Sequence, residues 1–207
     1  NEMKGDFARA IEYNNRLLDL DPYSFEGWVN IGKLYSMNEQ YEKAIDSFDF
    51  ALTINENDVS ALKMKALSLY LNDNAPEAIR IFEECIRISP DDESLYDSLL
   101  EGYEAMEQYD QMMRVIDIKE KRFGPKGIAT RRAFVELLKD NMASARELYN
   151  NIPADEKESL DYYMLEGELM FIDGDLRGAE AAYIKAALLS EDNEEIIDRL
   201  ANVSVAQ

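Results

Sequence analysis

The sequence of 207 residues contains no histidine and a single cysteine, Cys85. Without histidine there is no Ser-His-Asp or Cys-His catalytic arrangement, and without further cysteines there is no His/Cys zinc site and no internal disulfide. Five prolines and nine glycines are too few for the many turns of an all-β protein. The sequence also lacks a run of 18 apolar residues, so no segment is long enough to cross a bilayer as a helix.

Basic residues are scarce: 22 Lys and Arg stand against 43 Asp and Glu, which gives a formal net charge of −21. A charge this negative repels nucleic-acid phosphates and anionic lipid head groups. We therefore expect neither a nucleic-acid partner nor direct membrane insertion. Residues 1–6 are polar and show no signal peptide, which favours a cytoplasmic location, while a signal removed from further upstream stays open.

What the sequence does contain is an internal repeat of 34 residues. Small or apolar anchor residues recur at spacings of 34, 34, 34, 33 and 34, at Ala10, Ala44, Ala78, Met112, Ala145 and Ala179. Between anchors runs a second apolar stripe with helical spacing, seen in Trp28, Ile31 and Tyr35. Each repeat therefore predicts two helices. The expected helices are residues 6–20, 24–37, 41–54, 58–71, 75–88, 92–105, 109–122, 126–139, 142–151, 156–172, 176–189 and 193–203.

This pattern resembles the tetratricopeptide repeat family, in which large and small residues alternate at fixed positions of two helices. Residues 25–58 carry the family set as Trp28, Gly32, Tyr35, Ala44, Phe48 and Ala51. Two helices approach closely only where side chains are small, and one pair cannot bury its apolar face alone. The resemblance implies an all-α fold: an α-solenoid of antiparallel helix pairs, wound as a right-handed superhelix of about five to six repeats.

We expect a single solenoid domain over residues 1–207, because no linker interrupts the repeats. Its units are 1–24, 25–58, 59–92, 93–126, 127–159, 160–193 and 194–207. The first unit is expected to hold only a second helix, and the last a capping helix. Because helix 6–20 lacks its hairpin partner, part of its apolar stripe is expected to be exposed and to drive self-association. Two units depart from the family pattern, with Leu100 and Met112 in 93–126, and with Phe134 and a one-residue deletion in 127–159.

Two loops have a chemical and a structural interpretation. Asp173, Gly174 and Asp175 resemble the start of a calcium loop, but Arg177 stands where a third ligand is required, so a tight turn is favoured. Residues 124–127 lack the spacing of a phosphate-binding loop and favour a helix-breaking connection. We predict no cofactor and no metal.

The carboxylates and the single thiol also have both a chemical and a structural interpretation. Glu101 and Glu104, like Glu166 and Asp173, have helical spacings at which paired acids can do acid/base chemistry. With so many acids in the chain, solvated surface is the favoured interpretation. Cys85 replaces a small core alanine and is expected to be a buried thiol rather than a nucleophile. No catalytic residues are predicted.

The resemblance implies that the first helix of each repeat lines a concave groove that binds a peptide or a helix. The implied groove residues are Asn30, Lys33, Met37, Lys63, Met64, Tyr70, Glu101, Arg131 and Arg132. Some family members hold the C-terminal carboxylate of chaperones with a lysine and asparagine set. That set is missing here, since Val29, Lys33 and Met64 occupy three of its positions.

A local excess of basic residues, +5 over residues 119–132, has two interpretations. Its first members can complement the C-terminal end of a helix dipole. Arg131 and Arg132 can instead anchor an acidic group of a ligand, unless Glu101 and Glu104 pair with them inside the protein. The sequence leaves both open.

Together these features predict a non-catalytic scaffold for protein–protein interaction, with a protein or peptide as its partner. Two alternatives remain open at this point. The chain can be a regulatory or docking segment of a longer enzyme, or a surface- or secretion-associated protein that binds a glycan or polymer. The identity of the partner is not encoded in any motif of the sequence.

Overall fold

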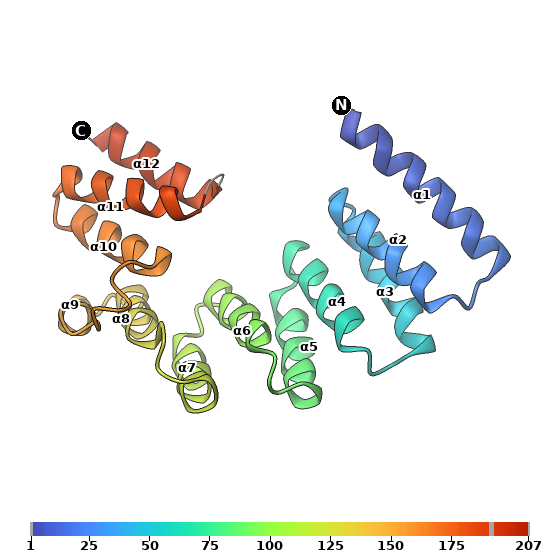
Figure 1. Cartoon of the computed structure of the whole chain (residues 1–207), viewed down its shortest axis with the longest axis horizontal. Helices are drawn as coiled ribbons and strands as arrows, with labels where there is room; N and C mark the ends of the chain where they lie inside the picture. The colour runs from blue at the N-terminus through green and yellow to red at the C-terminus, as the bar shows by residue number, and fades with distance from the viewer. Residues whose placement is uncertain (1, 191–192, 207) are drawn as a thin grey trace. The chain divides into compact units, whose positions relative to one another are not determined.

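The computed structural model describes residues 2–190 and 193–206 and contains only helices within these ranges (Figure 1). Helices follow one another as pairs, so the predicted all-α solenoid of helix pairs is confirmed. The helices are α1 (Glu2–Leu20), α2 (Phe25–Met37), α3 (Tyr41–Ile54), α4 (Val59–Leu71), α5 (Ala75–Ile88), α6 (Glu93–Ala105), α7 (Tyr109–Phe123), α8 (Ile128–Leu138), α9 (Met142–Asn150), α10 (Leu160–Ile172), α11 (Leu176–Leu189) and α12 (Glu194–Ala206).

The helices fall into two compact units, Asn1–Gln108 with α1 to α6 and Tyr109–Gln207 with α7 to α12. The boundary lies inside the repeat 93–126, between α6 and α7. In the first unit α2 packs on α3 and α4 on α5, and in the second α8 packs on α9 and α10 on α11. That residues 1–207 form a single domain stays a prediction.

Small residues allow close approach inside the pairs, as the repeat pattern predicts. In the pair α2 and α3, Ala44 and Ala51 are fully buried on either side of Phe48. A Cβ atom at Gly32 would lie 2.7 Å from Cε1 of Phe48, so only glycine fits beneath this ring. The same arrangement recurs between α10 and α11, where a Cβ atom at Gly167 would lie 2.7 Å from Cδ1 of Tyr183.

The turn inside each pair has a left-handed residue at the same repeat position. Four of these residues are acidic, Glu39, Asp73, Glu107 and Asp140, with φ between 54° and 59°, and the fifth is Gly174 with φ of 77°. Side chains with a Cβ atom pay a steric penalty in this backbone region, whereas glycine does not. Four of the five turns are therefore strained at a position that glycine would satisfy.

Two predicted helix starts are too early, for reasons found in the local backbone. Predicted helix 126–139 begins at Ile128, because Gly127 has φ of 75° and stands at the N-cap. Predicted helix 156–172 begins at Leu160, because the Ser159 side chain accepts the Tyr162 N–H and caps the helix there. Residues 151–159 instead form a connection in which Ile152 is buried against α8 and α10.

A buried carboxylate in this connection caps a helix distant in sequence. Glu156, only 5% exposed, accepts hydrogen bonds from the N–H of Thr130 at 3.0 Å and from its Oγ1 at 2.8 Å. Gly127 at the N-cap of α8 has no side chain to offer, so Glu156 supplies the missing acceptor. It also places a negative charge at the positive end of the α8 dipole.

Replacing Glu156 should therefore destabilise the second unit. In Glu156→Ala, the N–H and hydroxyl of buried Thr130 lose their acceptor, which lowers the free energy of unfolding by about 1–3 kcal/mol. The exposed neighbour Glu158 provides the control, since Glu158→Ala should change stability by less than about 0.5 kcal/mol. Urea unfolding followed by circular dichroism measures both. Equal stability of the two variants would contradict the capping role.

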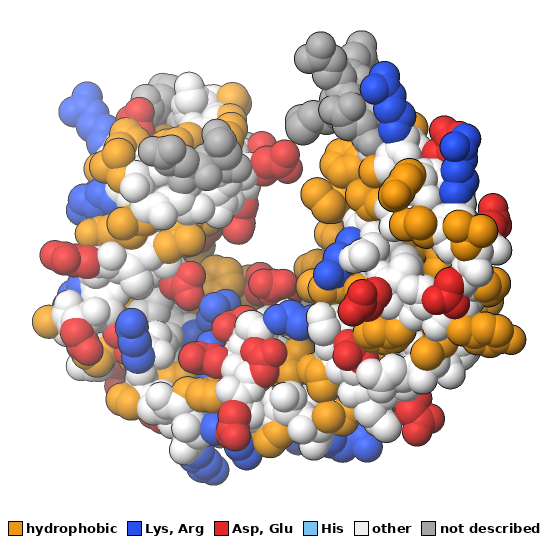
Figure 2. Space-filling model, turned by 45° about the vertical axis from the view of Figure 1, so that its right-hand side comes forward, with side chains coloured by type: hydrophobic (Ala, Val, Ile, Leu, Met, Phe, Trp, Pro, Cys, Tyr) orange, Lys and Arg blue, Asp and Glu red, His pale blue; other side chains and the backbone are white. Residues whose placement is uncertain are grey.

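The apolar stripe of α1 is only partly covered. Leu18 is buried against the first unit, whereas Tyr13, Leu17 and Leu20 are exposed by 64%, 44% and 84%. Hydrophobic side chains are visible on the surface of the first unit, at the right of Figure 2. The expected exposure of helix 6–20 is thus found for these residues, while self-association through it stays a prediction.

The last two helix pairs of the second unit pack differently from the others. Elsewhere in each unit, a second helix packs along the first helix of the next repeat, as α3 does on α4 and α5 on α6. The backbones of α9 and α10 do not approach in this way, and α10 packs on α8 instead. α9 instead contacts α10 through side chains, as Tyr149 does with Glu166 and Arg146 with Asp173.

Candidate functional site

The first helices α2, α4 and α6 of the first unit pack side by side (Figure 1). Side chains join them directly: the Lys63 Nζ donates to Ser94 Oγ at 2.6 Å, and Ser68 Oγ lies 3.4 Å from Ser36 Oγ. Three successive repeats thus carry predicted groove residues on neighbouring helices, and that these residues form one binding surface stays a prediction. We call this surface the first-helix face, made of Asn30, Lys33, Met37, Lys63, Met64, Tyr70 and Glu101.

The first-helix face combines exposed and half-buried side chains. Asn30, Lys33 and Glu101 are exposed, and Met37 is exposed by 66%. Met64 is half-buried, because it packs against the cluster that includes Val29, Ala51 and Ala61. The face thus offers apolar, amide and charged groups of both signs.

Tyr70 and Glu101 come from different repeats and influence each other. Partial burial raises the pKa of the Tyr70 hydroxyl, and the nearby charges of Glu101 and Glu104 raise it further. The hydroxyl therefore stays protonated and available as a hydrogen-bond donor. The structure brings these predicted groove residues together.

In the second unit, Arg131 and Arg132 both have acidic partners inside the protein. Arg132 pairs with Asp117 at 2.7 Å and with Glu120 at 2.8 Å, both on α7. Hydrogen bonds to Glu120 and Asp117 raise the pKa of Arg132. Arg131 pairs with Asp161 of α10 at 3.2 Å. A ligand carboxylate would have to compete with these partners, and binding by the two arginines stays a prediction.

The second unit also contains a cleft between α9 and α10, of about 190 Å³. Its lining comes from one face of each helix: Arg146, Tyr149 and Asn150 of α9, and Glu166, Leu169, Met170 and Asp173 of α10. We call it the α9–α10 cleft. Arg146 and Asp173 bridge the two helices through a bidentate ion pair, one bond of which measures 2.7 Å.

Two tyrosines converge on one carboxylate oxygen in this cleft. The hydroxyl oxygens of Tyr149 and Tyr162 lie 2.8 Å and 3.2 Å from Oε1 of Glu166 and 2.9 Å from each other. Each hydroxyl has one proton, so one can donate to the other while the second donates to Oε1. The two rings are stacked with their centroids 5.5 Å apart. Burial raises the pKa of the Tyr149 hydroxyl, with further contributions from its hydrogen bonds to Tyr162 and Glu166. Burial also raises the pKa of the Tyr162 hydroxyl, so both hydroxyls stay protonated.

Sequence comparison identifies the repeat at residues 25–58, which match the family described as tetratricopeptide repeat. The chain has the tetratricopeptide repeat fold. The resemblance predicted from the 34-residue period is thus confirmed by sequence in this one repeat, and the predicted fold is confirmed along the chain. No curated protein sequence matches the chain.

Solved structures with the tetratricopeptide repeat fold are similar over nearly the whole chain. A tetratricopeptide repeat protein from Parabacteroides merdae is 16% identical with a TM-score of 0.72, covering 98% of this chain and 80% of its own. A thermophilic one from Thermus thermophilus is 19% identical with a TM-score of 0.66, covering 88% and 100%. YrrB, described as having an unusual peptide-binding site, is 14% identical with a TM-score of 0.56, covering 91% and 97%. Likeness at these identities shows the fold alone.

The turn before α11, the single cysteine and the basic residues at the end of α7 have structural roles in this tetratricopeptide repeat fold. Gly174 is the left-handed residue of the turn before α11, and Asp175 caps that helix by accepting the Gly178 N–H. Cys85 is fully buried, and burial raises the pKa of its thiol to about 11, so the expected core role is confirmed. Lys121 and Arg122 lie in the last turn of α7, where they complement the helix dipole.

One expectation about acids needs correction. Glu166 and Asp173 were expected to be solvated surface, and Asp173 is about half exposed. Glu166 instead is half-buried beneath two tyrosine hydroxyls. Sequence reasoning found the pair of acids but not the tyrosines, because Tyr149 belongs to the preceding repeat.

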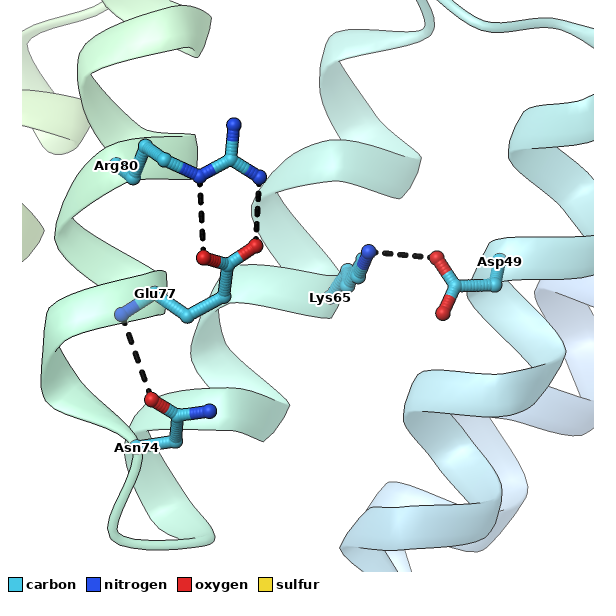
Figure 3. A network of polar contacts seen from close by, with 5 residues as sticks. All are labelled: Asp49, Lys65, Asn74, Glu77 and Arg80. Carbon is cyan, nitrogen blue, oxygen red and sulfur yellow. Dashed lines mark hydrogen bonds and ion pairs between the residues drawn. The ribbon is translucent and has the colours of Figure 1, made fainter.

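Charged side chains on helices α3, α4 and α5 of the first unit form ion pairs with one another. Lys65 of α4 pairs with Asp49 of α3 at 2.6 Å, and Arg80 donates twice to Glu77 within α5 (Figure 3). The hydrogen bond from Arg80 is the main cause that lowers the pKa of Glu77. Asn74 caps α5 by accepting the Glu77 N–H.

Across residues 2–190 and 193–206, no group of three or more Cys, Asp or Glu side chains is arranged to hold a metal ion. Within the same ranges, none of the helices combines the length and the apolar character needed to span a membrane.

Proposed function

We propose that this tetratricopeptide repeat protein is a non-catalytic scaffold that binds a peptide or helix of a partner protein on its first-helix face. The observation that carries the proposal is the lateral packing of α2, α4 and α6, the helices that hold the predicted groove positions of three repeats. Proteins with this fold generally act as interaction scaffolds. The similarity to YrrB, whose description names a peptide-binding site, supports a peptide as the ligand class.

The side chains on this face suit an extended or helical segment. Met37 and Met64 offer adaptable apolar contacts, and Asn30 can donate to and accept from a peptide backbone. Lys33 is exposed, so its ammonium is accessible to an acidic group of the partner. Lys63 is already engaged by Ser94 and positions the α4 part of the face.

A phage-displayed library of twelve-residue peptides tests the proposal without a known partner. Peptides selected on the native protein should lose about tenfold or more in affinity for the variant Lys33→Glu/Met37→Ser, because it reverses a charge and removes an apolar contact. Fluorescence anisotropy with labelled peptides measures the affinities. Both positions are exposed, so the helices should remain intact by circular dichroism.

The matched control is Arg87→Glu/Ile88→Ser, which makes the same kinds of change at the end of α5, on a second helix of the same unit. Selected peptides should bind this control within about twofold of the native protein. If no peptide is enriched, or if both variants lose affinity equally, the first-helix face is not the binding surface.

A further inference from the structure

Glu166 is a half-buried side chain with one carboxylate oxygen that has no hydrogen-bond partner in the part of the chain that the structure describes. Its Oε1 is contacted by the linked hydroxyls of Tyr149 and Tyr162, whereas no hydrogen bond or ion pair within the described residues reaches Oε2. The one basic side chain lining the cleft, Arg146, is held in a bidentate pair by Asp173. A carboxylate oxygen that faces a cleft can pair with a cation, and none of the described side chains supplies one.

The lining of the cleft indicates which cation would fit. Arg146, Glu166 and Asp173 give it one positive and two negative charges, so its net charge favours a cation. Leu169 and Met170 provide apolar surface for an alkyl stem. The ring of Tyr149 adds an aromatic surface to the lining.

The hydrogen bonds already present favour an ammonium over a guanidinium. A guanidinium binds a carboxylate best through two parallel bonds, one to each oxygen. Oε1 is already contacted by two hydroxyl groups, so only Oε2 is free to accept. An ammonium is a compact charge that needs a single acceptor and can turn its other protons toward water.

We propose that the α9–α10 cleft binds a lysine side chain of a partner protein, with its ammonium at Oε2 of Glu166 and its methylene stem on Leu169 and Met170. The site lies in the second unit and does not depend on the first-helix face. It exists because α9 and α10 do not pack backbone to backbone, which leaves room between them for an inserted side chain.

Titration of the 15N-labelled protein with Nα-acetyl-lysine amide, followed by NMR, tests the proposal. Amide shifts should change around the lining residues of the cleft and saturate. The neutral isostere Nα-acetyl-norleucine amide should bind about tenfold more weakly or not at all, because it lacks the charge. Equal binding of the two probes, or shift changes located elsewhere, would overturn the proposal.

Three variants test whether Glu166 is the group that holds the ammonium. Glu166→Gln keeps an acceptor for the tyrosines but should weaken the lysine probe about tenfold. Glu158→Gln makes the same charge change at an exposed position and should leave the affinity unchanged. Arg146→Gln removes the competing cation and should strengthen binding about threefold.

The Arg146→Gln result also distinguishes a cation site from an anion site. If Arg146 held an anionic ligand, this variant would bind the lysine probe no better, and Nα-acetyl-glutamate amide would shift the same amides in the native protein. Arg146 is partly exposed, so its replacement should not unfold the unit. Unchanged lysine affinity in Glu166→Gln would likewise reject the site.

Discussion

Glycine at the four acidic turn positions is expected to raise the free energy of unfolding by about 2–4 kcal/mol in total. The variant combines Glu39→Gly, Asp73→Gly, Glu107→Gly and Asp140→Gly, all of which have positive φ. Each change removes a Cβ clash in the left-handed region, and the gain is reduced by the extra freedom of glycine in the unfolded chain. Urea unfolding followed by circular dichroism gives the free energy.

Two controls separate backbone strain from charge. Glu39→Gln and Glu107→Gln remove a negative charge but keep the Cβ atom, so they should recover only the small part due to the helix dipole, about 0.3–1 kcal/mol each. Gly174→Glu does the reverse in the fifth turn. A Cβ atom at position 174 meets no atom within 4 Å. Gly174→Glu should therefore lower the free energy of unfolding by about 1–2 kcal/mol through backbone strain alone. A stabilisation by the glutamine variants equal to that of glycine would show that charge is the cause.

Gly167→Ala is expected to lower the free energy of unfolding by about 1–3 kcal/mol, although alanine normally favours a helix over glycine. The new methyl group would lie 2.7 Å from both Cδ1 and Cζ of Tyr183. Tyr183 is only 1% exposed, so its ring has little room to move away. Steric overlap therefore outweighs helix propensity at this position.

A double-mutant cycle with Tyr183→Ala provides the control. With the ring removed, Gly167→Ala should become stabilising by up to about 1 kcal/mol, because only its helix propensity remains. Tyr183→Ala itself creates a large cavity, so the cycle is best measured in the background with glycine at the four strained turns. The expected coupling energy is about 2–3 kcal/mol, and additive effects would contradict the close approach of α10 and α11.

The sequence predicted the helix pairs well because their cause is local and repeated. Gly32, Gly167 and the buried alanines stand at fixed repeat positions, so the period alone identifies where helices touch. Helix starts were less accurate, since they depend on which residue caps the first free N–H groups. Gly127 cannot cap with a side chain, and the acceptor that α8 uses, Glu156, comes from the following connection.

The α9–α10 cleft could not be predicted from the sequence, because it too depends on contacts between residues of different repeats. Tyr149 and Glu166 lie on two helices separated by the connection 151–159, and their spacing in the sequence does not show that they meet. A one-residue deletion in the repeat was visible, but its effect on the spacing of two helices was not. By contrast, the sequence did suggest that acidic side chains of the protein itself pair with Arg131 and Arg132. It did not indicate the partners found on α7 and α10.

The contact of α9 with α10 through side chains rather than close backbones has a consequence for how this unit unfolds. A repeat array behaves as a one-dimensional chain in which each element is held by its own stability and by nearest-neighbour coupling. That coupling is weakest where helix backbones do not meet, so we expect α10 to α12 to open by hydrogen exchange as a cooperative block separate from α8 and α9. A ligand bound between α9 and α10 would strengthen the coupling between these two helices. Binding should then slow the hydrogen exchange of backbone amides in both α9 and α10.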